Sequence, residues 1–233
     1  MLGSFCPAAG QKAASGTHRD FPARWVAGAE VDAAAVLSCG VEAFFTESSL
    51  PDAVFARMQG VSFVDNPHIA RADLRYLRLL HYDGEGRIRM GELVCNRRIA
   101  RELLEIFRGL YAEKYPIAKV KLIDDYGADD ERSMSDNNTS CFCYRAVQGT
   151  AKLSRHALGM AVDINPLYNP YCRRRKDGTL LVRPSSARPY ADRRKSFRQK
   201  ITREDLCYKL FTARGFKWGG AWKSCQDYQH FEK

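Results

Sequence analysis

The sequence predicts an α+β fold in which helices pack on a mainly antiparallel sheet. Two alternating apolar segments within residues 73–95 are separated by the turn residues Asp83-Gly-Glu-Gly86, which is typical of a β-hairpin. Apolar residues follow helical spacing over 99–113, and start and stop signals predict a second helix over about 202–215. Strands and helices therefore do not alternate regularly along the chain, as a doubly wound parallel sheet would require.

The start of the chain lacks any sustained pattern. Residues 1–40 are rich in Ala, Gly and Ser, and we expect them to form a poorly ordered N-terminal arm. Residues 41–233 are expected to form a single domain that carries a basic insertion at about 173–203. The apolar pieces within residues 41–64 are short, because Pro51 interrupts them.

The middle of the chain predicts one long helix ahead of a strand. Asn96 is a good N-cap, and the helix that follows should end near Glu113, just before Pro116. Residues 118–123 alternate like a strand. The acidic and polar residues 124–140 are expected to form a long loop.

The last third predicts short strands around a second helix. Residues 159–164 alternate like a strand. Thr202 is expected to cap the helix and Gly215 to close it. Short strands are expected over 216–222 and 228–231.

The net charge of +10 is concentrated in one place. Residues 173–203 contain twelve Lys and Arg and two acids, and the rest of the chain has 37 − 12 = 25 bases and 27 − 2 = 25 acids. Such an insertion is either a loop that meets an anionic surface or a solvated loop. Nucleic acid is not the expected partner, because only Tyr190 and Phe197 place aromatic rings in this stretch.

Cysteine usage and hydropathy narrow the class of protein further. The eight cysteines are even in number but form no C-x-x-C pair, so mostly buried thiols are expected, with at least one disulfide as the alternative. No apolar run reaches the ~18 residues that a membrane-spanning helix needs. Residues 1–30 carry charges and glycines throughout, so no signal peptide is expected there.

A metal-ligand motif lies in the stretch Ser154-Arg-His-Ala-Leu-Gly-Met-Ala-Val-Asp163, with the pattern S-x-H-x-x-G-x-A-x-D. Neutral imidazole and carboxylate are both good zinc ligands. His156 and Asp163 are seven residues apart, so on a straight strand their side chains would face opposite ways. The chain must bend between them, and Gly159 is the residue that allows the bend.

A second motif near the C-terminus supplies the missing groups. A catalytic zinc typically has three protein ligands and one open position, and His230 is the obvious third ligand. Asp227 precedes it by three residues and is a candidate general base. Because a spacing of three places the two side chains on opposite faces of a flat strand, we expect a bulge or tight turn between them.

The two motifs, S-x-H-x-x-G-x-A-x-D and D-x-x-H-F, resemble those of the zinc D-alanyl-D-alanine carboxypeptidases. That family includes vancomycin-resistance dipeptidases and carboxypeptidases and the phage endolysins that cut L-alanyl-D-glutamate bonds. The resemblance extends from roughly residue 130 to the end. It implies one Zn²⁺ per chain, bound by His156, Asp163 and His230, and the fold shared by these peptidases and the hedgehog signalling domain.

The resemblance also implies an activity. We expect a metallopeptidase that hydrolyses peptidoglycan stem peptides, most simply a carboxypeptidase that removes a terminal D-alanine. The alternatives are an L-alanyl-D-glutamate-type endopeptidase and a non-catalytic, zinc-containing module that binds the cell wall. Such enzymes usually work outside the cytoplasm or facing the wall, where the basic insertion would meet anionic wall polymers.

Two further polar residues near the first motif are candidates for the site. Family members use an arginine near the metal to hold oxyanion charge or a substrate carboxylate, and Arg145 is the candidate here, with a surface arginine as the alternative. Ser154 is expected either to hydrogen-bond the substrate or to fix the ligand loop. Near the second motif, Trp218, Trp222 and Tyr228 either line the cleft or belong to the core.

Overall fold

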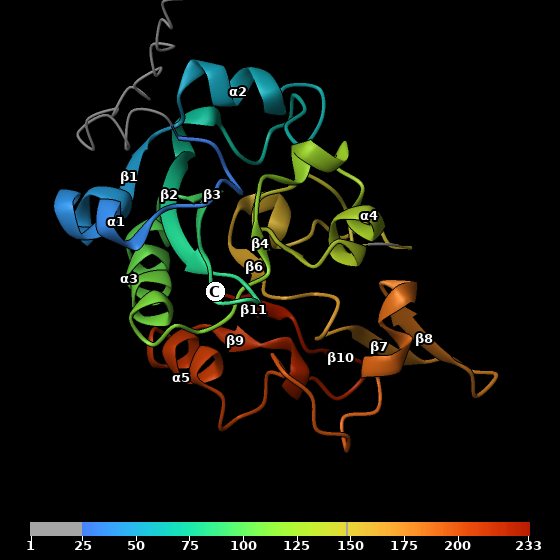
Figure 1. The fold of residues 1–233 in the computed structure, drawn as a ribbon. Helices are drawn as coiled ribbons and strands as arrows, with labels where there is room; N and C mark the ends of the chain where they lie inside the picture. The colour runs from blue at the N-terminus through green and yellow to red at the C-terminus, as the bar shows by residue number, and fades with distance from the viewer. Residues whose placement is uncertain (1–24, 148) are drawn as a thin grey trace, which may run out of the picture.

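The computed structural model describes residues 25–147 and 149–233 and combines helices with mainly antiparallel sheets (Figure 1). Strands β2 (Leu74–Tyr82) and β3 (Ile88–Asn96) form the predicted hairpin. At its turn, the Asp83 carboxylate accepts hydrogen bonds from the backbone N–H groups of Glu85 and Arg87. Strand β1 (Thr46–Ser49) extends the sheet along β2. These elements confirm the predicted α+β class.

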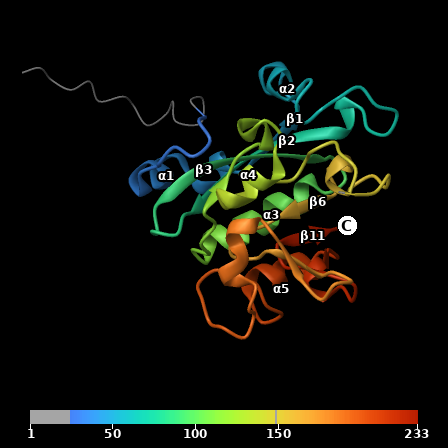
Figure 2. The same cartoon turned by 90° about the vertical axis from the view of Figure 1, so that its right-hand side faces the viewer.

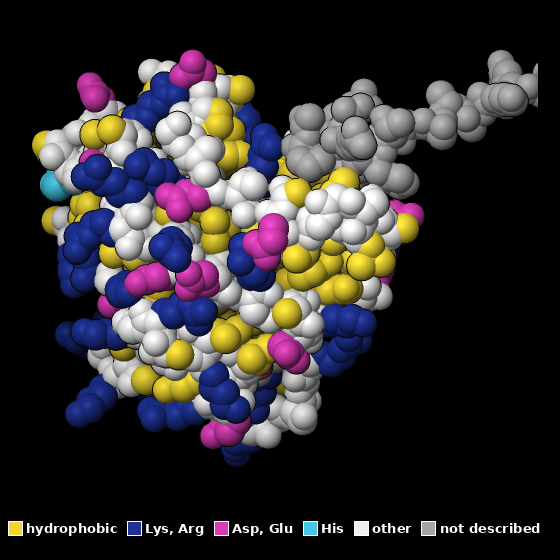
Figure 3. Space-filling view, turned by 90° about the vertical axis from the view of Figure 1, so that its left-hand side faces the viewer, with side chains coloured by type: hydrophobic (Ala, Val, Ile, Leu, Met, Phe, Trp, Pro, Cys, Tyr) yellow, Lys and Arg dark blue, Asp and Glu magenta, His cyan; other side chains and the backbone are white. Residues whose placement is uncertain are grey.

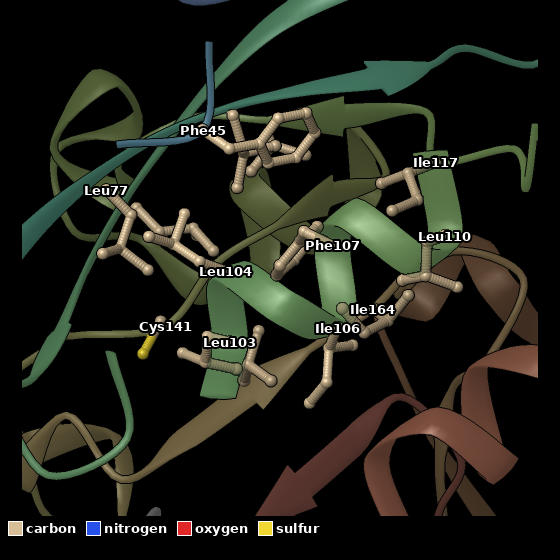
Figure 4. Packing of buried hydrophobic residues seen from close by; sticks show 14 of the residues in the cluster. Phe45, Leu77, Leu103, Leu104, Ile106, Phe107, Leu110, Ile117, Cys141 and Ile164 are labelled. Atoms are coloured by element: carbon tan, nitrogen blue, oxygen red, sulfur yellow. The ribbon is translucent and has the colours of Figure 1, made fainter. Parts of the chain in front are cut away.

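Helix α3 (Ala100–Ala112) packs against this hairpin (Figure 4). Its apolar face is buried in the core, as the helical spacing predicts, through Leu103, Leu104, Ile106, Phe107 and Leu110. The N-cap is Ile99 and not Asn96. The Asn96 side chain instead accepts from the backbone N–H of Arg98 and donates to the carbonyl oxygen of Leu158. It therefore ties the hairpin to the segment that carries the first motif.

Residues 25–40 differ from the poorly ordered arm that the composition of residues 1–40 predicts. They include helix α1 (Ala33–Cys39), and Val31 and Ala35 are buried in the main core. Even a short alanine-rich helix can pack closely on a sheet, because its small side chains let the backbone approach. Residues 1–24 lie outside the described residues. Four elements lie between α1 and the hairpin: η2 (Val41–Phe44), β1, α2 (Asp52–Met58) and η3 (Arg71–Asp73).

The segment 124–140 is not the long loop that its polar composition predicts. It contains most of η4 (Ile123–Tyr126), α4 (Asp130–Ser135) and β5 (Asn138–Thr139), which pairs in parallel with β4 (Lys119–Val120). Polar side chains hold this structure together from within. The buried Asn138 amide accepts from the backbone N–H of Lys121 and donates to the carbonyl oxygen of the same residue. Side chains that replace a strand partner in this way are difficult to recognise from composition.

The second sheet has the order β6–β11–β9, formed by β6 (Ala161–Asp163), β11 (His230–Glu232) and β9 (Lys217–Trp218). Helix α5 (Leu206–Ala213) packs between this sheet and α3. Its N-cap is Asp205, which accepts from the backbone N–H of Cys207, and not Thr202. In Figure 2, β6 and β11 lie side by side near the C-terminus.

The basic insertion begins with a hairpin. Strands β7 (Tyr171–Arg174) and β8 (Leu180–Arg183) are antiparallel and project at the lower right of Figure 1. The following η6 (Ser185–Tyr190) packs against α4. On its other edge β7 pairs with β10 (Gln226–Asp227), so the insertion is a direct strand neighbour of the second motif.

A common core joins the two parts of the chain. Residues of β2, β3 and α3 share one buried cluster with Val162, Phe211 and Phe231. Five cysteines of the described residues are buried free thiols, which agrees with the expected buried thiols: Cys95, Cys141, Cys143, Cys172 and Cys207. No helix of the described residues has the length and apolar character needed to cross a membrane.

Candidate metal centre

The first motif folds as a short turn followed by a strand. His156 opens η5 (His156–Leu158), and Gly159 ends it with a left-handed φ of +65°. A Cβ atom at Gly159 would lie 2.6 Å from the backbone nitrogen of Asn96, so the position also requires the absence of a side chain. The backbone N–H of Asn96 donates to the Gly159 carbonyl across this close approach. The chain then enters β6, which confirms the predicted bend between His156 and Asp163.

Strand pairing brings in the third residue. His230 at the start of β11 lies directly opposite Asp163 at the end of β6 in the antiparallel ladder. Asp163 is also bridged on its other side to Ser140, through hydrogen bonds in both directions between their backbones. Both backbone groups of Asp163 are hydrogen-bonded to Ser140, and the N–H of the next residue, Ile164, donates to the Gln229 carbonyl, so the Asp163 carboxylate has a defined direction.

The ligand atoms of His156, Asp163 and His230 lie within 4.8 Å of one another. His156 Nε2 is 3.2 Å from His230 Nδ1 and 3.3 Å from Asp163 Oδ2. His230 Nδ1 is 3.0 Å from Asp163 Oδ1. Tetrahedral zinc with bonds of about 2.0–2.1 Å has ligand atoms about 3.3 Å apart, so the three groups fit this metal.

The outward-facing ring nitrogens are both bonded to acceptors. His156 Nδ1 lies 2.6 Å from the carbonyl oxygen of Cys141, and His230 Nε2 lies 3.2 Å from Glu232 Oε2. Each of these nitrogens therefore carries a proton and donates it, which is the usual outer-shell arrangement of metal-binding histidines. The tautomers that result leave His156 Nε2 free for a cation at the centre of the cluster, and His230 Nδ1 faces the same point.

The electrostatics of the cluster also favour positive charge. Burial alone would lower the pKa of His230, but hydrogen bonds with Asp163 and Glu232 outweigh it and raise this pKa to about 10. Burial alone would raise the pKa of Asp163, but His156 and His230 hold it well below its ordinary value. Without a metal, His230 thus retains a proton beside an ionised Asp163. A metal ion would take the place of that proton.

Asp227 stands beside this cluster on a different strand. It ends β10, and a bend at Tyr228 and Gln229 leads into β11, which confirms the expected tight turn before His230. Its Oδ1 atom is enclosed and has no hydrogen-bond partner among the described residues. Burial and the charge of Asp163 raise the pKa of Asp227 to about 7, against the opposing influence of the two histidines.

The close approach of Asp227 depends on η7 (Gly219–Ala221). A Cβ atom at Gly219 would lie 2.9 Å from the Cβ of Asp227 and 3.2 Å from the Cβ of His230. Glycine at this position therefore leaves the space that both side chains occupy.

The structure places Arg145 and Ser154 near the first motif, but in local interactions. Arg145 Nε lies 2.6 Å from Asp130 Oδ2. Burial alone would lower the pKa of Arg145, but Asp130, Cys143 and Asp163 outweigh burial and raise this pKa. The buried Ser154 hydroxyl accepts from the backbone N–H of His156. The hydroxyl of Ser154 therefore fixes the ligand loop, and a role of either residue toward substrate stays a prediction.

Two residues of the site, Glu232 and Gly219, were not predicted from the sequence, whereas the tryptophans near the second motif were named as candidates and differ in their surroundings. Trp222 lies with its ring centre 5.2 Å from that of His230, whereas Trp218 is buried and donates from Nε1 to the Tyr228 carbonyl. Glu232, which orients His230, was missed, although its position two residues after the ligand is a usable signal. The contribution of Gly219 has no such signal, because it depends on a contact between separate segments.

A buried pair of histidines with one carboxylate, next to an unpaired acid, defines the class of hydrolytic metalloenzyme sites. Residues 148–233 match the sequence model of a family described as D-alanyl-D-alanine carboxypeptidase. Over these residues the match agrees with the resemblance to zinc D-alanyl-D-alanine carboxypeptidases that the two motifs predict. The match includes His156, Asp163, Asp227 and His230 and begins after Arg145. No curated protein and no solved structure was found to match the chain.

Proposed function

We propose that this protein is a zinc-dependent metallopeptidase that hydrolyses peptidoglycan stem peptides and removes a terminal D-alanine. The observation that carries the proposal is the convergence of His156, Asp163 and His230 with the unpaired Asp227 carboxylate. The family match over these residues supports the peptide substrate. We also propose the hedgehog/DD-peptidase type of fold, which the antiparallel β6–β11 pairing of two ligands supports.

In the proposed mechanism, His156 Nε2, one carboxylate oxygen of Asp163 and His230 Nδ1 hold the metal. When bound, zinc supplies a Lewis acid that polarises the scissile carbonyl and lowers the pKa of water. Cys141 and Glu232 keep the two imidazoles in the tautomers that direct these nitrogens inward. All three ligands are half-buried or buried, so competing bulk water is limited.

Asp227 is proposed to move the protons. Its unpaired Oδ1 is available to accept a proton from the attacking water, and the same oxygen then donates it to the leaving amine. The raised pKa, about 7, makes this carboxyl a stronger base than an exposed aspartate. A bound dication would lower this pKa again, so the carboxyl would remain ionised at neutral pH before the reaction.

An L-alanyl-D-glutamate-type endopeptidase is the first alternative, because the same metal chemistry would cut that bond. A non-catalytic zinc-containing module that binds the cell wall is the second. An enclosed carboxylate oxygen without a hydrogen-bond partner, as Asp227 Oδ1 is among the described residues, costs stability, and a module that only binds would gain nothing from it. Asp227 therefore favours an enzyme over a binding module.

The substrate bond is tested by mass spectrometry of purified stem peptides after incubation with the protein and zinc. Loss of one D-alanine from a pentapeptide is the expected result. Cleavage after L-alanine would assign the endopeptidase instead, and intact peptides with retained wall binding would assign the binding module. A His156→Ala variant serves as the control, because it lacks one of the proposed ligands.

The location of such a substrate implies work outside the cytoplasm or facing the wall, and we include this in the proposal. Free thiols in the described residues are compatible with it, because burial raises the pKa of Cys172 to about 11 and of Cys143 to about 12. Thiols in this state are largely protonated and react slowly with oxidants.

A further inference from the structure

The tip of the β7–β8 hairpin carries four consecutive bases, Arg173, Arg174, Arg175 and Lys176, which we call the basic tip. All four residues are exposed. None of them forms an ion pair with an acid of residues 25–147 or 149–233. Two other arginines of the insertion do so, since Arg183 pairs with Glu131 and Arg194 with Asp192.

The acid within the tip, Asp177, offsets only one of the four positive charges and leaves a net charge of 4 − 1 = +3. The Asp177 carboxylate accepts hydrogen bonds from the backbone N–H and the hydroxyl of Thr179, at 2.9 and 2.6 Å. The Arg174 side chain donates to the Gly178 carbonyl at 2.8 Å, and the backbone N–H of Arg175 donates to the Thr179 carbonyl. The turn is therefore built from local hydrogen bonds, and the positive charges of the basic tip are left for an external partner.

The arrangement of these charges indicates the shape of the partner. Successive side chains of a strand point to opposite faces, so the bases of β7 are distributed over both faces of a two-stranded ribbon. A flat anionic surface would contact one face. A flexible polymer can contact both faces and the turn, and every contact would release counterions.

The basic tip is also connected to the metal centre. Tyr171, at the base of β7, pairs with Asp227, and Cys172 pairs with Gln226. A polymer that follows the hairpin from its tip therefore arrives at the strand that bears the proposed general base. Figure 3, which faces the opposite side of the molecule, shows Lys and Arg side chains among Asp and Glu side chains.

We propose that the basic tip binds a flexible anionic polymer, with phosphate or carboxylate groups along its chain, and thereby holds the protein on wall material that carries its substrate. Polymer binding is carried by the hairpin alone, whereas the delivery of substrate rests on the proposed function. The two parts are therefore separable by experiment.

The experiment measures binding to linear polyphosphate, to poly-L-glutamate and to anionic phosphatidylglycerol vesicles. The test variant is Arg173→Gln, Arg175→Gln and Lys176→Gln, which keeps the hydrogen bond from Arg174 to Gly178. A charge-keeping variant, Arg173→Lys with Arg175→Lys, should bind like the original. The matched control removes three exposed bases elsewhere, by Arg98→Gln, Lys114→Gln and Lys209→Gln.

We expect the test variant to lose at least about tenfold in affinity for a polymer and the matched control to change less than about twofold. The slope of log K against log salt should fall by about 2, as expected for three lost contacts at about 0.7 each. Equal losses in both variants would show an effect of net charge and would overturn the proposal. Tighter binding to vesicles than to either polymer would overturn it as well.

Turnover separates this inference from the proposed function. The test variant should cleave a free pentapeptide at the original rate and lose activity on walls that carry anionic polymer. If the original protein cleaves no free pentapeptide, the proposed function fails while polymer binding stands. If it cleaves free peptide and the test variant cleaves walls equally well, the role of the basic tip in substrate delivery is rejected.

Discussion

At the scale of single residues, the metal ligands form the first test. Replacement of His156 or His230 by alanine removes one of the three proposed ligands, and Asp163 with one remaining histidine cannot hold a zinc ion. We expect zinc content to fall from about one per chain to near zero, with loss of hydrolysis. Elemental analysis after dialysis gives the zinc content. His68, an exposed histidine outside the cluster, serves as the control, and full zinc occupancy in either ligand variant would refute the assignment.

Asp227 requires a different test, because it does not contact the metal in the proposed arrangement. Asp227→Asn keeps the shape of the side chain within the tight contact with Gly219 but removes the acid. Turnover should fall by about 10²–10⁴-fold, the usual contribution of general acid–base catalysis, while zinc content stays near one per chain. Substrate affinity should change much less, since the proton transfer matters in the transition state. Turnover close to that of the original protein would end the general-base assignment.

His81 provides a test of pH dependence at a residue remote from the metal motifs. Its ring is buried, Nδ1 donates to the Ile117 carbonyl, and Nε2 has no partner among the described residues. Burial, with a smaller contribution from Arg89, outweighs the opposing influence of the backbone and Asp83 and lowers the pKa of His81 from 6.5 to about 4. The neutral ring is thus the form that the fold accepts.

The sign of the resulting effect follows from proton uptake. Between pH 6.5 and 4 the unfolded chain protonates His81 and the folded chain does not, so stability is complete above pH 6.5 and declines as the pH falls. The decline should approach about 3 kcal/mol at pH 4. Denaturant unfolding of the original protein and of His81→Gln at pH 7 and pH 4.5 measures it. A decline of equal size in His81→Gln would show that other groups cause it.

At the scale of elements, Gly159 decides whether the turn between the two ligands of the first motif can form. Gly159→Ala would place a Cβ in the left-handed region and 2.6 Å from the backbone nitrogen of Asn96. Backbone atoms cannot move away as a flexible side chain can, so we expect a loss of stability of about 2 kcal/mol or more and a lower zinc affinity. Chemical denaturation and zinc titration measure the two effects.

Gly127 offers a matched control for this substitution. It ends η4 with a φ of +67°, close to the +65° of Gly159, but a Cβ there would meet nothing within 4 Å. Gly127→Ala should therefore cost only the conformational term, about 1 kcal/mol. If the two variants lose the same stability, the contact with Asn96 does not contribute.

Elements that depend on residues close together in the sequence were predicted correctly, and those that depend on other contacts were not. The β2–β3 hairpin, α3 and the bend at Gly159 depend on neighbours in sequence, and their patterns predict them. Helix starts were misplaced at Asn96 and Thr202, because the side chains of both residues bond to backbone groups outside a capping position. The prediction of a loop over 124–140 was wrong. The Asn138 side chain bonds the backbone N–H and carbonyl of Lys121, and the polar composition of the segment does not reveal this.

At the scale of the whole molecule, the sequence by itself identified the residues of the candidate metal centre. The two motifs contain the residue types that zinc prefers, at spacings that require a bend in each, and they identify His156, Asp163, Asp227 and His230. Charge counting likewise located the basic insertion. These features are local in the chain, so no knowledge of tertiary contacts is needed to find them.

Only the tertiary structure decided which groups support these residues. The pairing of β6 with β11 places Asp163 opposite His230, and β10 joins Asp227 to the basic hairpin. Cys141, Glu232 and Gly219 contribute a carbonyl, a carboxylate and an absent side chain. Arg145 was placed beside Asp130, a partner that its sequence position does not indicate. Hydrogen bonds and close packing act over a few ångströms in space, and the sequence alone does not show which distant segments come that close.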